Sequence, residues 1–133
     1  TVERLKGLRE VLAEHPHVQV EVQAGDYTLM PSYLHTLDYL AEHSAPDAIM
    51  GFNQLITLGA LRALRMHNIA HDSLTICGID RLPFADIFGV PIACVAHDAS
   101  LAGSSAVRLL LDRLQDPYKP RDKVVIAGVL ENG

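Results

Sequence analysis

The stretch PDAIMGFNQLITLGALRA, Pro46 to Ala63, decides the fold of this chain. A short apolar run, Ala48 to Met50, ends at Gly51, and leucines then recur every third residue from Leu55. This order predicts a buried strand, a tight turn and a core-packed helix that is capped by Asn53. In open α/β sheets the ligand binds outside the carboxyl ends of the strands. Asn53 therefore stands where a ligand contact is expected.

The rest of the chain repeats this alternation of helical and strand patterns. We expect a loop over residues 68–72 and an irregular segment with a short helical turn over residues 81–89. Helices that alternate with apolar strands predict an α/β fold with an open, mostly parallel sheet. The expected helices are 1–14, 31–43, 53–67 and 99–115, the last capped by Asp98, and the expected strands are 17–23, 48–51, 73–79, 91–96 and 123–127.

Polar residues follow several of these expected strands at the point where each strand ends. They are Asp26 with Tyr27, then Asn53, Asp80 and His97. Parallel strands place their carboxyl ends along one edge of a sheet, so these side chains are predicted to form a binding site. Each also has a simpler interpretation: a helix cap for Asn53, a turn residue for Asp80, surface packing for Tyr27, and a boundary position for His97.

Size and composition limit the possible classes of protein. The 133 residues fit one ordinary domain, and a hydrophobic content of 49% argues against disorder. The net charge is −5 and the basic residues are scattered, so this part of the protein is not expected to contact DNA itself. No apolar run is long enough to span a bilayer, and the first residues lack the apolar core of a signal peptide. Cys77 and Cys94 are predicted to be small, reduced core residues, with a disulfide between them as the alternative.

Patterns typical of metal sites and of enzymes are weak. His35, Asp38 and Glu42 share one helix face, but no further Cys or His pair completes a tetrahedral site, so we expect no metal. His71, Asp72 and Ser73 are adjacent in sequence and cannot form a catalytic relay. No glycine-rich phosphate loop is present, and we expect neither a cofactor nor enzymatic activity.

Several segments, in order and with matching spacing, resemble LacI/GalR-type transcriptional regulators in their effector-binding domain. The stretch from Pro46 is similar to the family pattern P-D-A-I-x-x-x-N-D-x-x-A-L-G-A-x-R-A-L. The others are the helix TVERLKGLRE, the turn AGDYT, the segment from Asp72 to Asp98, and AVRLLLDRL in the helix that follows. The resemblance implies the C-terminal part of a three-layer, periplasmic-binding-protein-like sheet of type I.

Carried over position by position, the resemblance implies that the effector contacts are Arg4, Tyr27, Asn53, Asp80 and His97. Their chemistry suits such roles, because an arginine can donate a forked pair of hydrogen bonds and a carboxylate can accept two hydroxyl protons. Three residues depart from the family pattern. Gln54 stands where an Asp is usual, Arg81 where Asp or Asn is usual, and His97 where Gln is usual, which makes a bound anion conceivable near Arg4, Arg81 and His97.

The resemblance also implies how the chain is organised. Residues 1–96 would form the C-terminal lobe, 97–117 a crossover helix that packs on the N-terminal lobe, and 118–133 a return strand and tail. The chain is then a piece of a longer protein, and its last helix would expose its leucines unless other residues cover it. The family's dimer contact falls on Leu58, Leu61, Phe84, Ile87 and Phe88, although Leu58 and Leu61 are equally interpretable as core.

The function implied is that of the sensing and dimerising part of a cytoplasmic DNA-binding regulator. Its partners would be a sugar-like, sugar-phosphate or nucleoside-like effector, a second copy of the chain, and operator DNA bound through a helix-turn-helix domain outside this sequence. An alternative is a periplasmic sugar-binding protein of an ABC transporter, which shares the fold. The identity of the effector and the operator, and the choice between induction and co-repression, do not follow from the sequence.

Overall fold

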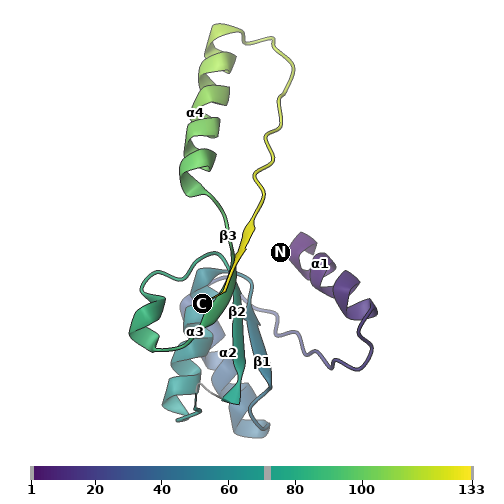
Figure 1. Cartoon of the computed structure of the whole chain (residues 1–133), viewed down its shortest axis with the longest axis vertical. Coiled ribbons are helices and arrows are strands. Elements are labelled where there is room, and N and C mark those ends of the chain that lie inside the picture. The colour runs from purple at the N-terminus through teal and green to yellow at the C-terminus, as the bar shows by residue number, and fades with distance from the viewer. Residues whose placement is uncertain (1, 71–72, 133) are drawn as a thin grey trace.

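The computed structural model describes residues 2–70 and 73–132, and in it helices and strands alternate over most of the chain (Figure 1). The helices agree with the expected ones to within two residues at each end. The elements are α1 (Val2–Ala13), α2 (Leu29–Glu42), β1 (Ala48–Gly51), α3 (Gln54–Met66), β2 (Thr75–Ile79), the 3-10 turn η2 (Ala85–Phe88), β3 (Ile92–Ala96), α4 (Ala99–Gln115) and β4 (Val129–Glu131).

The four strands form one open sheet in the order β1-β2-β3-β4. The first three strands are parallel, and β4 runs antiparallel to β3. The register places Gly51 of β1 beside Gly78 of β2, and Gly78 beside Cys94 of β3. The carboxyl ends of β1, β2 and β3 therefore lie at the same edge of the sheet, and the α/β, mostly parallel architecture is confirmed.

The hydrophobic core lies on one face of the sheet, where α2 and α3 pack (Figure 1). Burial alternates along the strands, so Ile76 and Ile92 face this core while their neighbour Cys77 is half-buried on the opposite face. None of the residues of α1 is buried, and this helix lies beside the sheet. The buried core residues are Leu40, Leu61, Leu64, Ile76, Leu82, Val90 and Ile92.

Two expected strands are absent, and both predictions were wrong for the same physical reason. Residues 17–23 have the alternating pattern of a strand, but Val18, Val20 and Val22 remain 45–48% exposed, and the segment pairs with no strand in the described part of the chain. The register pairs Val129 with Ala96, the last residue of β3. Residues 123–127 lie beyond this end of β3, so no residue of β3 stands opposite them. An extended segment becomes a strand only where another strand satisfies its backbone groups.

The helix caps follow the sequence predictions, whereas only one of the two cysteines lies in the core as expected, because Cys77 is half-buried. Asn53 accepts a hydrogen bond from the backbone N–H of Ile56, and Asp98 accepts one from Leu101, each at 2.8 Å. Cys77 and Cys94 are both free thiols, and Cys94 is buried. The described residues do not include Thr1 or residues 71 and 72. Part of the expected loop 68–72 and of the His71-Asp72-Ser73 set therefore lies outside them.

The helix α4 projects away from the sheet, and the chain returns beside it to reach β4 (Figure 1). None of its residues is buried, although its sequence is rich in apolar side chains. The expectation that this helix exposes its leucines is confirmed, with Leu101, Leu110, Leu111 and Leu114 each 48–69% exposed. Among the residues that the structure describes, no helix combines the length and apolar character needed to cross a membrane.

Candidate ligand-binding site

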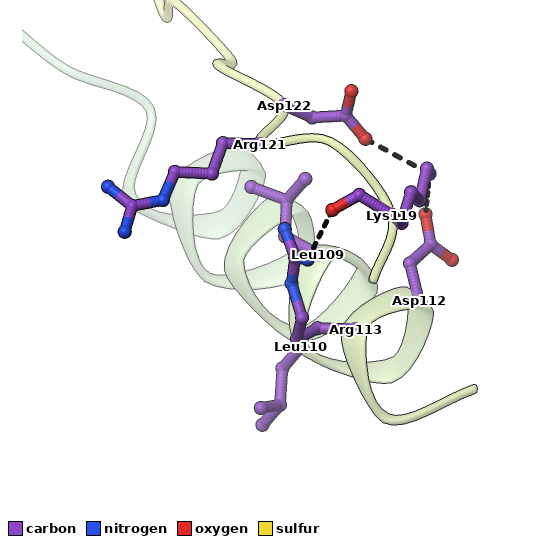
Figure 2. Close-up of a pocket in the computed structure, with 7 residues that line it drawn as sticks. All are labelled: Leu109, Leu110, Asp112, Arg113, Lys119, Arg121 and Asp122. Atoms are coloured by element: carbon purple, nitrogen blue, oxygen red, sulfur yellow. Dashed lines mark hydrogen bonds and ion pairs between the residues drawn. The ribbon is translucent and has the colours of Figure 1, made fainter. Parts of the chain in front are cut away.

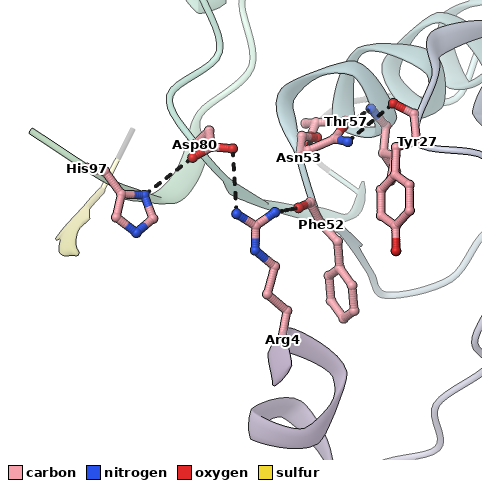
Figure 3. A network of polar contacts seen from close by, with 8 residues as sticks. Arg4, Tyr27, Phe52, Asn53, Thr57, Asp80 and His97 are labelled. Carbon is pink, nitrogen blue, oxygen red and sulfur yellow. Dashed lines mark hydrogen bonds and ion pairs between the residues drawn. The ribbon is translucent and has the colours of Figure 1, made fainter. Parts of the chain in front are cut away.

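Polar residues from three parallel strands converge at the carboxyl edge of the sheet (Figure 3). Asn53 follows β1, Asp80 follows β2 and His97 follows β3. Arg4 reaches the same place from α1 (Figure 3). The sequence predicted this convergence, and it arises because a parallel sheet gathers its strand ends at one edge.

Asp80 is the centre of the group. Its carboxylate lies 3.3 Å from Nδ1 of His97 and 4.0 Å from Nη2 of Arg4. Arg4 also donates a hydrogen bond to the carbonyl of Phe52, in the turn after β1. The side chain of Asp80 keeps 41% of its surface exposed, so its oxygens remain within reach of a solute.

The backbone at Asp80 is unusual and helps to present the carboxylate. Its φ is +72°, in the left-handed region that non-glycine residues seldom occupy. Aspartate tolerates this region better than most residues, and the N–H of Asp80 donates to the carbonyl of Val95 at 3.0 Å. The turn after β2 is therefore fixed to β3 at the residue that carries the acid.

Asn53 joins the turn before α2 to the start of α3. Its Oδ1 caps α3, while its Nδ2 donates to the carbonyl of Tyr27 at 3.3 Å (Figure 3). Tyr27 thus contributes its backbone to this contact, and its side chain is 47% exposed. The capping role of Asn53 is established, and its amide also holds Tyr27 at the edge of the site.

A buried threonine beneath these residues supports the site, and the sequence predictions missed it. Thr57 is 2% exposed and donates from Oγ1 to the carbonyl of Asn53 at 3.0 Å. Gly51 and Gly78 leave room for it, because a Cβ on Gly51 would lie 2.2 Å from that hydroxyl oxygen. The available signal was a glycine near the end of each of two neighbouring strands, which indicates a close approach of another group.

The side chain of Arg81 is turned towards β4 and forms a forked ion pair with Glu131. The hydrogen bond to Glu131 raises the pKa of Arg81, and the same bond lowers the pKa of the Glu131 carboxyl. A bound anion near Arg4, Arg81 and His97 stays a prediction, and the charge of Arg81 is already matched by Glu131. The charges at the site itself come from Arg4, Asp80 and, when protonated, His97.

The residues expected at a dimer contact differ in exposure. Leu61 is 2% exposed inside the core, so its side chain does not reach an interface, and its inclusion was wrong. Leu58 and Phe88 are partly buried against the core. Phe84 and Ile87 remain 73% and 69% exposed around η2, which makes them the apolar surface of this region.

A separate hollow lies at the end of α4 and is occupied by the chain's own ion pairs (Figure 2). Lys119 lies 3.1 Å from Asp112 and 3.0 Å from Asp122, and hydrogen bonds to Asp122 and Asp112 raise its pKa. Arg113 donates to the carbonyl of Pro117 at 3.1 Å and to that of Lys119. These contacts fix the turn after α4.

Within residues 2–70 and 73–132, no three His, Cys, Asp or Glu side chains are grouped to hold a metal ion.

An open, mostly parallel sheet that carries a polar cluster at its carboxyl edge defines this chain as a lobe of an α/β binding fold. A family model described as "Periplasmic binding protein-like domain" matches residues 1–132. The chain belongs to this periplasmic binding protein-like family.

The distant relatives of the chain include LacI-family regulators. The HTH-type transcriptional repressor PurR of Photobacterium profundum is 24% identical over 123 residues, which are 90% of this chain and 36% of the relative. The HTH-type transcriptional regulator CelR of Thermobifida fusca is 30% identical over 116 residues, 85% of this chain and 34% of CelR. The chain therefore spans about a third of the length of the curated relatives that it matches.

Solved structures agree with this fold. A transcriptional regulator CelR–cellobiose complex superposes with a TM-score of 0.82 at 27% identity, over 98% of this chain and 41% of that chain. The periplasmic binding protein component of the arabinose ABC transporter from Shewanella sp. ANA-3, bound to L-arabinofuranose, superposes with a TM-score of 0.77. Its identity of 21%, over 98% of this chain and 45% of the other, indicates a shared fold alone.

Proposed function

We propose that this chain is the effector-sensing part of a LacI-type transcriptional regulator, which binds a sugar-like or nucleoside-like molecule. The observation that carries the proposal is Asp80, an accessible carboxylate between Arg4 and His97 at the carboxyl edge of a parallel sheet. Such a group accepts hydroxyl protons, while the arginine and histidine offer donors to the same ligand. The names of the curated relatives, which are repressors and regulators, support the regulatory part of the proposal.

The mechanism would be a shift between two arrangements of lobes. We propose that residues 1–96 belong to the C-terminal lobe, that 97–117 cross to the other lobe, and that 118–133 return. The projecting, unburied α4 supports this division. A ligand that binds one arrangement more tightly than the other would change the affinity of a separate DNA-binding domain for its operator. The protein would then act in the cytoplasm, where the operator is.

The proposal is tested by titrating the natural protein that contains this chain with cellobiose, L-arabinose and adenosine. At least one of them is expected to raise its unfolding temperature, because a ligand of the native state stabilises it by mass action. The same compound should change the protein's retention of genomic DNA fragments. Ligand binding without any DNA binding would favour a transport binding protein instead, and the absence of both would contradict the proposal.

We further propose that the exposed side chains of Phe84 and Ile87, together with the partly buried Leu58 and Phe88, lie in a two-fold dimer contact. A self-complementary apolar patch is typical of such contacts. Ile87→Asp is expected to raise the dimer dissociation constant at least about tenfold, because a charge would replace an apolar side chain at the interface. Sedimentation analysis measures this, and Tyr118→Asp, at a 96% exposed position on the turn after α4, serves as the control. An unchanged dimer in Ile87→Asp would exclude this surface.

A further inference from the structure

The forked ion pair between Arg81 and Glu131, here called the clasp, joins two distant parts of the chain. Nε of Arg81 donates to Oε2 of Glu131 at 2.9 Å, and Nη2 donates to Oε1. Such two-bond arginine–carboxylate pairs fix orientation as well as distance. The clasp connects the residue after Asp80 with the last residue of β4, fifty positions later.

The clasp closes a ring of contacts around the turn that presents Asp80. The N–H of Asp80 is bonded to Val95 of β3, and β3 pairs with β4, where Glu131 lies opposite Cys94. Glu131 then reaches back to Arg81, the next residue after Asp80. The left-handed turn is therefore held by β3 on one side and by the clasp on the other.

The exposure of the clasp suggests that its role is to position groups. The side chains of Arg81 and Glu131 are 70% and 36% exposed, and ion pairs at the surface contribute little to folding stability. β4 is reached only after α4 and its long return, so the clasp is where this part of the chain is tied to the turn of Asp80.

We propose that Arg81 and Glu131 are a positioning pair that couples the seating of β4 to the ligand affinity of Asp80. The affinity part of this inference rests on the proposed function, whereas the seating part does not. With the clasp closed, β4 stays paired with β3 and the Asp80 turn keeps its left-handed conformation. With the clasp broken, the end of β4 separates more often and the turn loses the restraint that the clasp supplies.

Cys94 offers a reporter that requires no ligand. Its Sγ lies 4.0 Å from Oε2 of Glu131, and the residue is 6% exposed. Burial raises the pKa of the Cys94 thiol, the charge of Glu131 raises it further, and the charge of Arg81 lowers it. A thiol in this state reacts slowly with alkylating reagents, so faster labelling reports separation of β4.

The loss of charge and the opening of the clasp would change the labelling rate of Cys94 in opposite directions. Through charge alone, Arg81→Gln would slow the labelling of Cys94, because it removes the group that lowers the pKa of that thiol. Through opening of the clasp, the same substitution would accelerate labelling. We expect N-ethylmaleimide to label Cys94 about fivefold faster in Arg81→Gln, with Cys77 unchanged as the internal reference.

The variants are made in the natural protein, and labelling is followed peptide by peptide with mass spectrometry. Exchange of the pair, Arg81→Glu with Glu131→Arg, is expected to return the labelling rate to within about twofold of the original. Glu10→Gln is the matched control, because it removes a carboxylate from the exposed Lys6–Glu10 pair on α1. Unchanged or slower labelling of Cys94 in Arg81→Gln would overturn the seating role of the clasp.

Calorimetric titration with cellobiose, L-arabinose and adenosine tests the coupling. For whichever compound binds the unmodified protein, Kd is expected to rise about fivefold in Arg81→Gln and to recover in the exchanged pair. Faster labelling with an unchanged Kd would overturn the coupling. Binding of none of the three by the unmodified protein would contradict the proposed function, while the labelling result would still decide whether the clasp seats β4.

Discussion

Asp80→Ala is expected to abolish effector binding while operator binding persists. The carboxylate of Asp80 is the acid that faces both Arg4 and His97, and we propose that it accepts two hydroxyl protons of the ligand. Hydrogen bonds to charged groups contribute about 1.5–3 kcal/mol each, so the loss of two corresponds to a Kd raised about 100-fold or more. The DNA-binding part of the protein would keep its affinity but lose its response to the effector.

Two companion variants separate a binding effect from a folding effect. Asp80→Asn keeps the size of the side chain and tolerates the left-handed backbone, so it should fold normally and lose only part of the affinity. Asp38→Ala removes an exposed carboxylate from α2 and should leave Kd unchanged. Calorimetry and an operator-release assay measure both properties. A full response of Asp80→Ala to the effector would show that Asp80 is not part of the binding site.

The parts of the fold that follow from local chemistry were predictable from the sequence. Asn53 and Asp98 are acceptors that directly precede apolar helical repeats, and both cap the helices they were expected to cap. The convergence of Asn53, Asp80 and His97 required only the inference that their strands are parallel. Parallel pairing carries all three strand ends to one edge, whatever the remaining side chains do.

The features that were not predictable depend on partners distant in sequence. The alternating valines at 18, 20 and 22 satisfy the strand pattern, but a strand also requires a neighbour, and periodicity carries no information about one. Leu58 and Leu61 have the same helical spacing, yet only Leu61 is fully inside the core. The sequence shows that Arg81 follows Asp80, but it does not show that the guanidinium of Arg81 is paired with Glu131, fifty positions later.

Gly59→Ala is expected to lower the free energy of unfolding by about 2 kcal/mol. Gly59 lies in α3 where it touches the start of α2, and a Cβ there would lie 2.5 Å from the carbonyl oxygen of Leu29 and 2.8 Å from Cβ of Ser32. A backbone oxygen cannot rotate away as a side chain can, so the helices must separate. Overpacking of this kind costs up to about 3 kcal/mol. The better helix propensity of alanine offsets about 1 kcal/mol of that cost.

The same substitution in α1 supplies a control of opposite sign. A Cβ on Gly7 would meet nothing within 4 Å, so Gly7→Ala should raise the free energy of unfolding by up to about 1 kcal/mol through helix propensity alone. Denaturant titration of both variants measures the difference. Because Leu29 lies two residues after Tyr27, whose carbonyl is held by Asn53, Gly59→Ala should also weaken ligand binding. Equal stability of the two variants would mean that α2 and α3 can separate without cost, and the rigid support inferred for the site would then be absent.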